Sequence, residues 1–201
     1  MSYYKLTIGL LFLLVNPLFS QENKTIDEVK GLQIGELVAD FSAEAANGKT
    51  FLLSEQLKKG SIVLVFIRGQ WCPYCNKHLS DLQDNLPAIY EKGASVVIVS
   101  PEKPEYIEKS IEKTGAEFTF LYDEGYNISK AFDVLFLPEK GTQIKYNLIG
   151  ANFKESHSDG TAFLPVPATF IIDGESKIIW RQFDEDYKNR SAVTDILSNI
   201  P

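Results

Sequence analysis

One continuous apolar segment constrains the fold of this chain more than any other feature of its sequence. Residues 62–67, I-V-L-V-F-I, contain no polar side chain, and they are too few to span a membrane as a helix. A run of this length is typical of a strand that is buried on both faces of a sheet. A second run, S-V-V-I-V-S, with four consecutive apolar residues between two serines, follows at 95–100. The two runs therefore predict the centre of a sheet that helices cover.

Helical patterns alternate with these strands. Leu79, Leu82, Leu86 and Ile89 recur at spacings of three and four, which predicts the apolar face of one helix over about 73–90. Further helices are predicted at 55–58, 104–114, 128–132 and 191–199, a strand at 118–121, and hairpins around Asn47-Gly48 and Asp173-Gly174. This order of elements predicts an α/β fold with a mixed central sheet flanked by helices.

The first 20 residues have the pattern of a secretory signal peptide. Lys5 precedes a short apolar run at 6–15, and Ser20 is a small residue suited to the position before a cut at Ser20–Gln21. The run is shorter than the ~20 apolar residues of a membrane-spanning helix. We therefore expect export to a periplasm or the cell exterior, with no membrane attachment in the mature form. A retained membrane anchor is the alternative.

The remaining chain is long enough for one domain. Residues 21–35 are predicted to be a loose polar lead-in, and 36–201 one domain. Within it, 137–165 is predicted to be a long irregular connection, which is typical of a functional or mobile segment. The net charge of -7 argues against nucleic acid as a partner.

The chain has two cysteines, Cys72 and Cys75, at the junction between the first apolar run and the amphipathic helix. Pro73 suits the first helical position, where its missing N–H is not needed. Cys72 would then face the unpaired N–H groups and the positive end of the helix dipole, which stabilise a thiolate. This position predicts a redox-active dithiol/disulfide pair.

The cysteine spacing also fits two other kinds of site. A static structural disulfide is one, but so short a loop brings little chain-entropy benefit. A zinc site of Cys72, Cys75, His78 and His157 is the other, but no second tight ligand pair exists. We therefore expect no metal and no cofactor, with His78 at or near the surface and His157 solvated.

Several segments resemble a known family. Residues 68–75, R-G-Q-W-C-P-Y-C, are similar to the R-G-x-W-C-P-[YF]-C signature of peroxiredoxin-like proteins in the alkyl hydroperoxide reductase/thiol-specific antioxidant (redoxin) family. Residues 38–41, 164–173 and 186–190 resemble the family's A-P-D-F, L-P-V-P-A-T-[YF]-x-I-D and D-Y-x-x-R segments. The resemblance covers about 34–199 and implies a thioredoxin-like fold within the thioredoxin-fold superfamily.

The resemblance also implies roles for residues around the pair. Pro167 is expected to be a cis-proline that faces the two cysteines across the site. The residues themselves indicate four further supporting positions. Trp71 either covers the rim of the site or serves packing alone, Pro73 begins the helix, Tyr74 is exposed between the cysteines, and Arg68 supplies a positive charge.

The order of attack stays open between two schemes. In a thioredoxin-like scheme Cys72 attacks and Cys75 resolves. The T-x-x-C pattern of peroxiredoxins instead places Cys75 at the peroxidatic position and Cys72 where threonine is usual. The peroxiredoxin arginine is also replaced by the segment around Pro167, so that Arg68 or Arg181 would have to substitute.

The expected function is a thiol-dependent antioxidant oxidoreductase. It would reduce hydroperoxides through a Cys72/Cys75 dithiol–disulfide cycle, and an external dithiol reductant such as a thioredoxin-like protein would regenerate it. One alternative is an exported thiol–disulfide oxidoreductase acting on protein disulfides. A non-enzymatic alternative is a binding module that uses 137–165 and a static disulfide.

Overall fold

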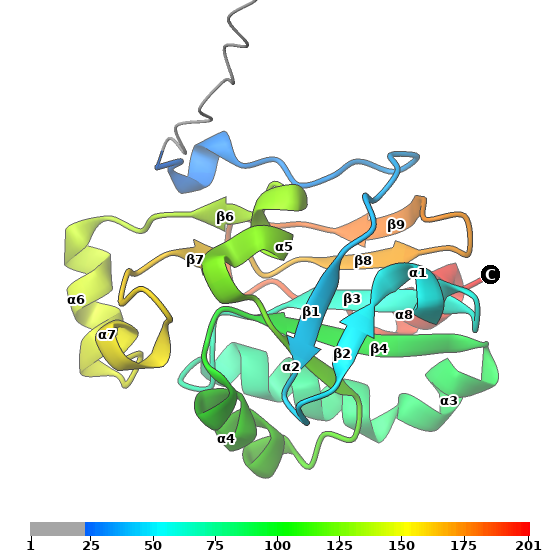
Figure 1. The fold of residues 1–201 in the computed structure, drawn as a ribbon, viewed down its shortest axis with the longest axis horizontal. Helices are drawn as coiled ribbons and strands as arrows, with labels where there is room; N and C mark the ends of the chain where they lie inside the picture. Colours follow the sequence, from blue (N-terminus) through cyan, green and yellow to red (C-terminus); the bar gives the residue numbers. More distant parts are fainter. Residues whose placement is uncertain (1–22) are drawn as a thin grey trace, which may run out of the picture.

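The computed structural model describes residues 23–201, which form a mixed sheet with helices against it (Figure 1). The signal-peptide prediction for residues 1–20 lies outside the described residues. Within 23–201, no helix has both the length and the apolar character needed to cross a membrane.

The centre of the sheet is built from the two apolar runs. Strands β3 (Ser61–Phe66) and β4 (Ala94–Ser100) pair in parallel, and β5 (Thr119–Tyr122) continues the parallel set beside β4. Every residue of β3 after Ser61 is buried. The prediction of a strand covered on both faces is therefore confirmed.

Antiparallel hairpins close both edges of the sheet, whose order is β2-β1-β5-β4-β3-β8-β9. Strands β1 (Ser42–Ala45) and β2 (Thr50–Leu52) form one hairpin, and β8 (Thr169–Ile172) and β9 (Ile178–Gln182) form the other. Both predicted hairpins and the mixed α/β architecture are thus confirmed. A separate two-stranded sheet joins β6 (Leu135–Phe136) to β7 (Leu164–Pro165).

The helix predicted over 73–90 is two helices, α2 (Pro73–Asp84) and α3 (Leu86–Glu91), with Asn85 between them. Pro87 explains the break, because proline has no N–H to donate and its ring clashes with the carbonyl four residues earlier. The other predicted helices are present as α1 (Leu53–Leu57), α4 (Pro104–Thr114), α5 (Asn127–Ala131) and α8 (Val193–Asn199). Helix α2 packs against α4.

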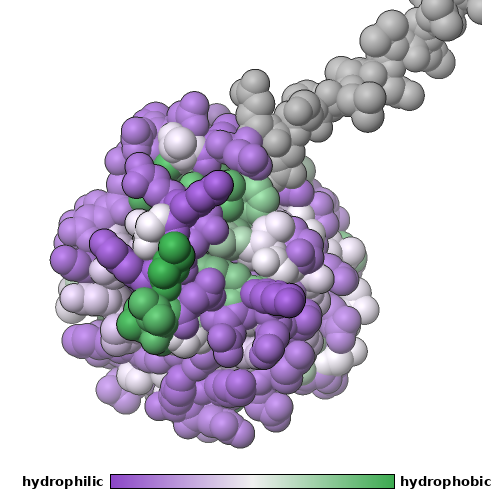
Figure 2. Space-filling model, turned by 90° about the vertical axis from the view of Figure 1, so that its left-hand side faces the viewer, coloured by the Kyte–Doolittle hydropathy of each residue, from purple (hydrophilic) through white to green (hydrophobic). Residues whose placement is uncertain are grey.

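The prediction of an irregular connection over 137–165 is wrong. This segment contains α6 (Lys140–Leu148) and the short helix α7 (Phe153–Ser156). Helix α6 has no buried residue, so its sequence lacks the apolar periodicity that identifies a helix. Two of its apolar side chains, Ile144 and Leu148, are exposed. Helix α6 lies on the left of Figure 1, the side that faces the viewer in Figure 2, where apolar surface lies among hydrophilic residues.

The lead-in is not loose over the residues that are described. It contains the 3-10 helix η1 (Ile26–Glu28), and the backbone N–H groups of Gly31 and Leu32 donate to the carbonyls of Asp133 and Phe132 at 2.9 and 3.1 Å. Arg181 on β9 donates to three lead-in carbonyls, those of residues 30, 31 and 32. The lead-in therefore lies fixed along the domain.

Candidate active site

Cys72 caps the N-terminus of α2, directly after the loop that follows β3. Its Sγ accepts a hydrogen bond from the backbone N–H of Cys75 at 3.4 Å, and Pro73 is the first helical residue, as predicted. This is the position at which a helix presents unpaired N–H groups and positive potential. Both cysteines are free thiols in this structure, and both are buried.

Two arginines bracket the sulfur pair. Arg68 Nη2 donates to Cys72 Sγ at 3.3 Å. Arg190 Nη2 lies 3.4 Å from Cys75 Sγ and 3.9 Å from Cys72 Sγ. Arg68 thus has the expected place as a positive charge at the site, whereas Arg181 bonds the lead-in instead. Arg190 was missed as a site residue, although it ends the D-Y-x-x-R segment that resembles the family.

The surroundings push the two thiols in opposite directions. The pKa of Cys72 is lowered to about 5, first by the hydrogen bond from the Cys75 thiol and then by the charge of Arg68, which together outweigh burial. Burial raises the pKa of Cys75, and the neighbouring Cys72 sulfur adds to the increase. At neutral pH the pair is therefore a thiolate at Cys72 beside a protonated Cys75.

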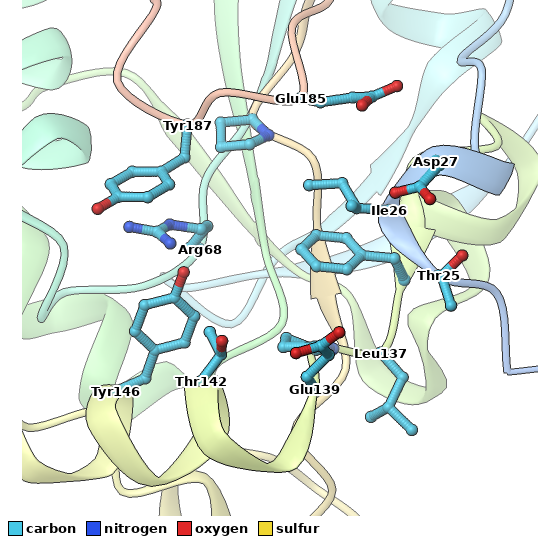
Figure 3. Close-up of a pocket in the computed structure, with 13 residues that line it drawn as sticks. Thr25, Ile26, Asp27, Arg68, Leu137, Glu139, Thr142, Tyr146, Glu185 and Tyr187 are labelled. Carbon is cyan, nitrogen blue, oxygen red and sulfur yellow. The ribbon is translucent and has the colours of Figure 1, made fainter.

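An aromatic cluster holds the Arg68 guanidinium. The carbon at its centre lies 3.8 Å from the ring centre of Tyr187, 4.8 Å from that of Tyr146 and 4.9 Å from that of Trp71. Figure 3 shows Arg68 between Tyr146 and Tyr187. Cation–π contacts of this kind favour a charged guanidinium over a ring face. The cluster therefore fixes the charge that faces Cys72.

Two other predicted support residues lie in the same cluster. Trp71 is buried against Tyr146 on α6 and Phe153 on α7, so that of its two predicted roles the structure shows packing. Tyr74 is exposed, as predicted, and its ring meets Tyr187 edge-on at 5.6 Å. The helices of the 137–165 segment thus form part of the site.

The predictions for the two histidines are wrong, because both are buried. His78 lies on the inner face of α2, and its Nε2 is 3.1 Å from Ser191 Oγ. His157 lies after α7, and its Nδ1 is 3.3 Å from the Tyr126 hydroxyl. Burial lowers the pKa of each to about 4. Over the described part of the chain, no three His, Cys, Asp or Glu residues are grouped to hold a metal ion.

The prediction of a cis peptide bond before Pro167 is also wrong. No peptide bond between residues 23 and 201 is cis. The chain enters this segment extended, since Leu164–Pro165 pairs with β6 and the Val166 N–H donates to the Val134 carbonyl. Pro167 nevertheless lines the same cavity as Arg68, so it does belong to the surroundings of the site.

A buried carboxyl group supports the loop that precedes Cys72. Glu102 is fully buried just beyond β4, and its Oε2 accepts the Gln70 N–H at 2.7 Å. Burial raises the Glu102 pKa to about 8. Gly69 must be glycine, because its φ is +144° and a Cβ there would lie 2.6 Å from Glu102 Oε1. Sequence reasoning missed Glu102, whose only signal was its place at the carboxyl end of a buried parallel strand.

A pair of cysteines at the N-terminus of a helix that follows a central strand of a mixed sheet is the arrangement of thioredoxin-fold thiol proteins. This chain has that arrangement. The sequence profile of the AhpC/TSA family matches residues 34–181. The chain therefore belongs to the AhpC/TSA family, as the resemblance of its motifs indicated.

Individual relatives divide between two activities by name. The thiol-disulfide oxidoreductase ResA of Halalkalibacterium halodurans is 26% identical over 105 residues, which cover 52% of this chain and 58% of that protein. Peroxiredoxin Bcp of Escherichia coli is 29% identical over 104 residues, covering 51% of this chain and 65% of Bcp. This chain thus matches less than two thirds of the length of each.

Solved structures confirm the thioredoxin fold. Peroxidoxin BcpB from Mycobacterium tuberculosis superposes with a TM-score of 0.67 at 22% identity, over 84% of this chain and 96% of that one. A putative protein disulfide isomerase from Bacteroides thetaiotaomicron gives a TM-score of 0.59 at 18% identity, over 84% and 88% of the two chains.

Proposed function

We propose that this protein is a thiol-dependent peroxidase in which Cys72 attacks the hydroperoxide and Cys75 resolves the product. One observation supports this order most strongly. Cys72 Sγ accepts from both Arg68 and the helix N-terminus, whereas Cys75 lies inside the helix and holds its proton. Because the thiolate is the nucleophile in peroxide reduction, Cys72 is the sulfur prepared to react.

The proposed cycle has three balanced steps. The Cys72 thiolate attacks the terminal oxygen of ROOH, the O–O bond breaks, and ROH leaves after taking a proton, so that Cys72 becomes a sulfenic acid. The Cys75 sulfur then attacks the Cys72 sulfur, which releases water and forms the disulfide. An external dithiol reduces that disulfide by exchange and is itself oxidised.

Arg190 is placed to assist the second step. Its Nη2 is 3.4 Å from Cys75 Sγ, and its Nε and Nη1 are buried without a hydrogen-bond partner among residues 23–201. Cys75 must lose its proton to attack, and a guanidinium at that distance stabilises the thiolate that forms. Arg190 therefore offsets part of the burial that raises the Cys75 pKa.

A second candidate function is reduction of protein disulfides by the same Cys72 thiolate. The name of the ResA relative supports this candidate. In either case we propose that the protein acts after export, because residues 1–20 have a signal-peptide pattern, and that a thioredoxin-like dithiol protein reduces it. Fractionation of cells that express the full chain tests the location.

Peroxide turnover distinguishes the two functions. Wild type, Cys72→Ser and Cys75→Ser are compared for consumption of hydrogen peroxide and for reduction of a protein disulfide with one dithiol reductant. We expect peroxide consumption in wild type, a peroxide-dependent sulfenic acid at Cys72 in Cys75→Ser, and neither in Cys72→Ser. Sulfenic acid at Cys75 in Cys72→Ser would reverse the assignment. Disulfide reduction without peroxide consumption would favour the second function.

A further inference from the structure

We propose that the cavity beside Arg68 binds the organic group of the substrate and selects uncharged or cationic groups over anionic ones. This inference rests on the proposed function and specifies its substrate class. The cavity has a volume of about 310 Å³. A space of this size suits a substituent of roughly the size of one aromatic ring with short chains.

Three segments that are far apart in the sequence build the cavity walls. The lead-in contributes Thr25, Ile26 and Asp27, and the residues between 136 and 146, which run from β6 into α6, contribute the opposite wall (Figure 3). Glu185 and Tyr187, which follow β9, form the third side. The lead-in is therefore part of this site, and its hydrogen bonds to β9 and to residues 132–133 hold one wall in place.

The cavity runs from solvent to Arg68, which contacts the sulfur of the fully buried Cys72. Its outer residues are exposed, whereas Phe136, Pro138 and Pro167 are buried along its walls. At its inner end Arg68 is only 2% exposed, and its Nη2 donates to Cys72 Sγ. Arg68 Nε has no hydrogen-bond partner between residues 23 and 201. A buried N–H without a partner is a donor that a substrate oxygen can satisfy.

The charges of the lining residues are mostly negative. The cavity is lined by the carboxylates of Asp27, Glu139 and Glu185, all in exposed residues, and by one cation, Arg68. The charge of Arg68 is opposed by the Cys72 thiolate. Lys30 Nζ lies 3.9 Å from Glu185, and among described residues Asp27 and Glu139 form no ion pair.

The carboxylates at the outer end of the cavity therefore repel a negatively charged substituent on the substrate. A carboxylate on the substrate would lie near two or three like charges while its peroxide reached the Cys72 thiolate. Like charges in partly hydrated clefts repel, and the effect weakens with salt. We expect an anionic substituent to lower the second-order rate by about tenfold at low ionic strength, since each nearby charge contributes a factor of a few.

One scaffold with three charges tests the selectivity. The reduced protein, without any reductant, is mixed with cumene hydroperoxide, with its para-carboxylate derivative or with its para-aminomethyl derivative, and thiol loss is followed. Hydrogen peroxide is the reference that carries no organic group. We expect the anionic probe to react about tenfold more slowly than the neutral one, and this ratio to shrink at high salt.

Variants that remove charges test whether the cavity carboxylates cause the difference in rate between the neutral and the anionic probe. Asp27→Asn combined with Glu139→Gln is expected to reduce the neutral-to-anionic ratio to about twofold, and Glu108→Gln, at an exposed position on α4, to leave it at the wild-type value. Thr142→Trp, which fills the cavity from α6, is expected to slow cumene hydroperoxide relative to hydrogen peroxide. Equal rates for all three probes in wild type, or an unchanged ratio in the double variant, would overturn the inference.

Two small disulfide reagents of different charge test this inference separately from the proposed peroxidase function. Neutral 4,4′-dithiodipyridine and dianionic 5,5′-dithiobis(2-nitrobenzoate) are each normalised to their reaction with a small free thiol. If no hydroperoxide reacts but the neutral disulfide is preferred in wild type and not in the double variant, the peroxidase proposal fails and the cavity assignment holds. If hydroperoxides react without any charge preference, the cavity assignment fails and the peroxidase proposal holds.

Discussion

At the scale of single residues, the site depends on what surrounds two identical side chains. Cys72 and Cys75 are one helical turn apart, yet their pKa values shift in opposite directions. Cys72 is at the helix N-terminus with Arg68 next to it, and Cys75 lies behind it in the core. Pro73 indicated this difference in the sequence, because it marks the first helical position. Burial of Cys75 followed from its place on the inner face of α2.

Glu102→Gln should change how stability depends on pH. In the wild type the buried carboxyl group keeps its proton up to its pKa of about 8, whereas an unfolded chain releases it near the ordinary glutamate pKa of 4.5. The folded state therefore binds more protons between these values, so this group makes the free energy of unfolding fall as pH rises. Glutamine resembles the protonated acid and lacks that slope.

We expect the stability of Glu102→Gln relative to wild type to increase by about 3–4 kcal/mol from pH 5 to pH 8. Urea unfolding of both proteins at each pH measures the difference. The opposite contribution of Cys72, whose lowered pKa adds stability as pH rises, is present in both proteins and cancels. Unfolding curves that stay the same distance apart across this range would show that Glu102 is ionised in the folded protein.

At the scale of elements, the sequence was most informative where one face or both faces of an element are buried. The strands β3 and β4 and the helix α4 were predicted within a residue or two of their observed ends. Helix α6 was not predicted, because none of its residues is buried and its stability comes from contacts such as that of Tyr146 with Trp71. The ordered lead-in was not predicted either, because the residues that hold it lie about a hundred or more positions away in the sequence.

Arg181→Lys should release the lead-in. The guanidinium donates to three backbone carbonyls, and a lysine ammonium, with its different shape, cannot satisfy all three. We expect a loss of about 1–3 kcal/mol in the free energy of unfolding and faster hydrogen exchange at the amides of Gly31 and Leu32. Lys92→Arg, at an exposed position after α3, is the control. Exchange at Gly31 that matches wild type would show that the bonds to residues 132–133 hold this segment without Arg181.

At the scale of the whole molecule, the fold brings together charges that the sequence keeps apart. Arg190 is 115 residues from Cys75 along the chain, and Glu102 is 32 residues from Gln70. Local patterns predicted the helix terminus, the two cysteines and the family. They contain no information on which distant side chain contacts a cysteine or the loop before it. Arg190 and Glu102 were therefore identified only from the three-dimensional structure.

This arrangement should make the reduced protein the more stable form. Oxidation removes the negative charge of the Cys72 thiolate and leaves Arg68 and Arg190 near the sulfurs without an anion between them. A buried charge that loses its partner destabilises the fold by a few kcal/mol, and a disulfide that closes so short a loop offsets only part of this. We expect the reduced form to melt about 5–10 °C above the oxidised form at pH 7.

The same charges should make the Cys72–Cys75 disulfide a comparatively strong oxidant, because stabilising the dithiol raises the reduction potential. Arg68→Met removes the nearer charge, so its potential should fall by about 40 mV and the gap between the two melting temperatures should narrow, since 30 mV corresponds to about 1.4 kcal/mol. Arg68→Lys keeps the charge, so its reduction potential should lie between those of wild type and Arg68→Met. Redox equilibration with glutathione measures the potentials. An Arg68→Met potential equal to that of wild type would mean that the helix N-terminus alone stabilises the Cys72 thiolate.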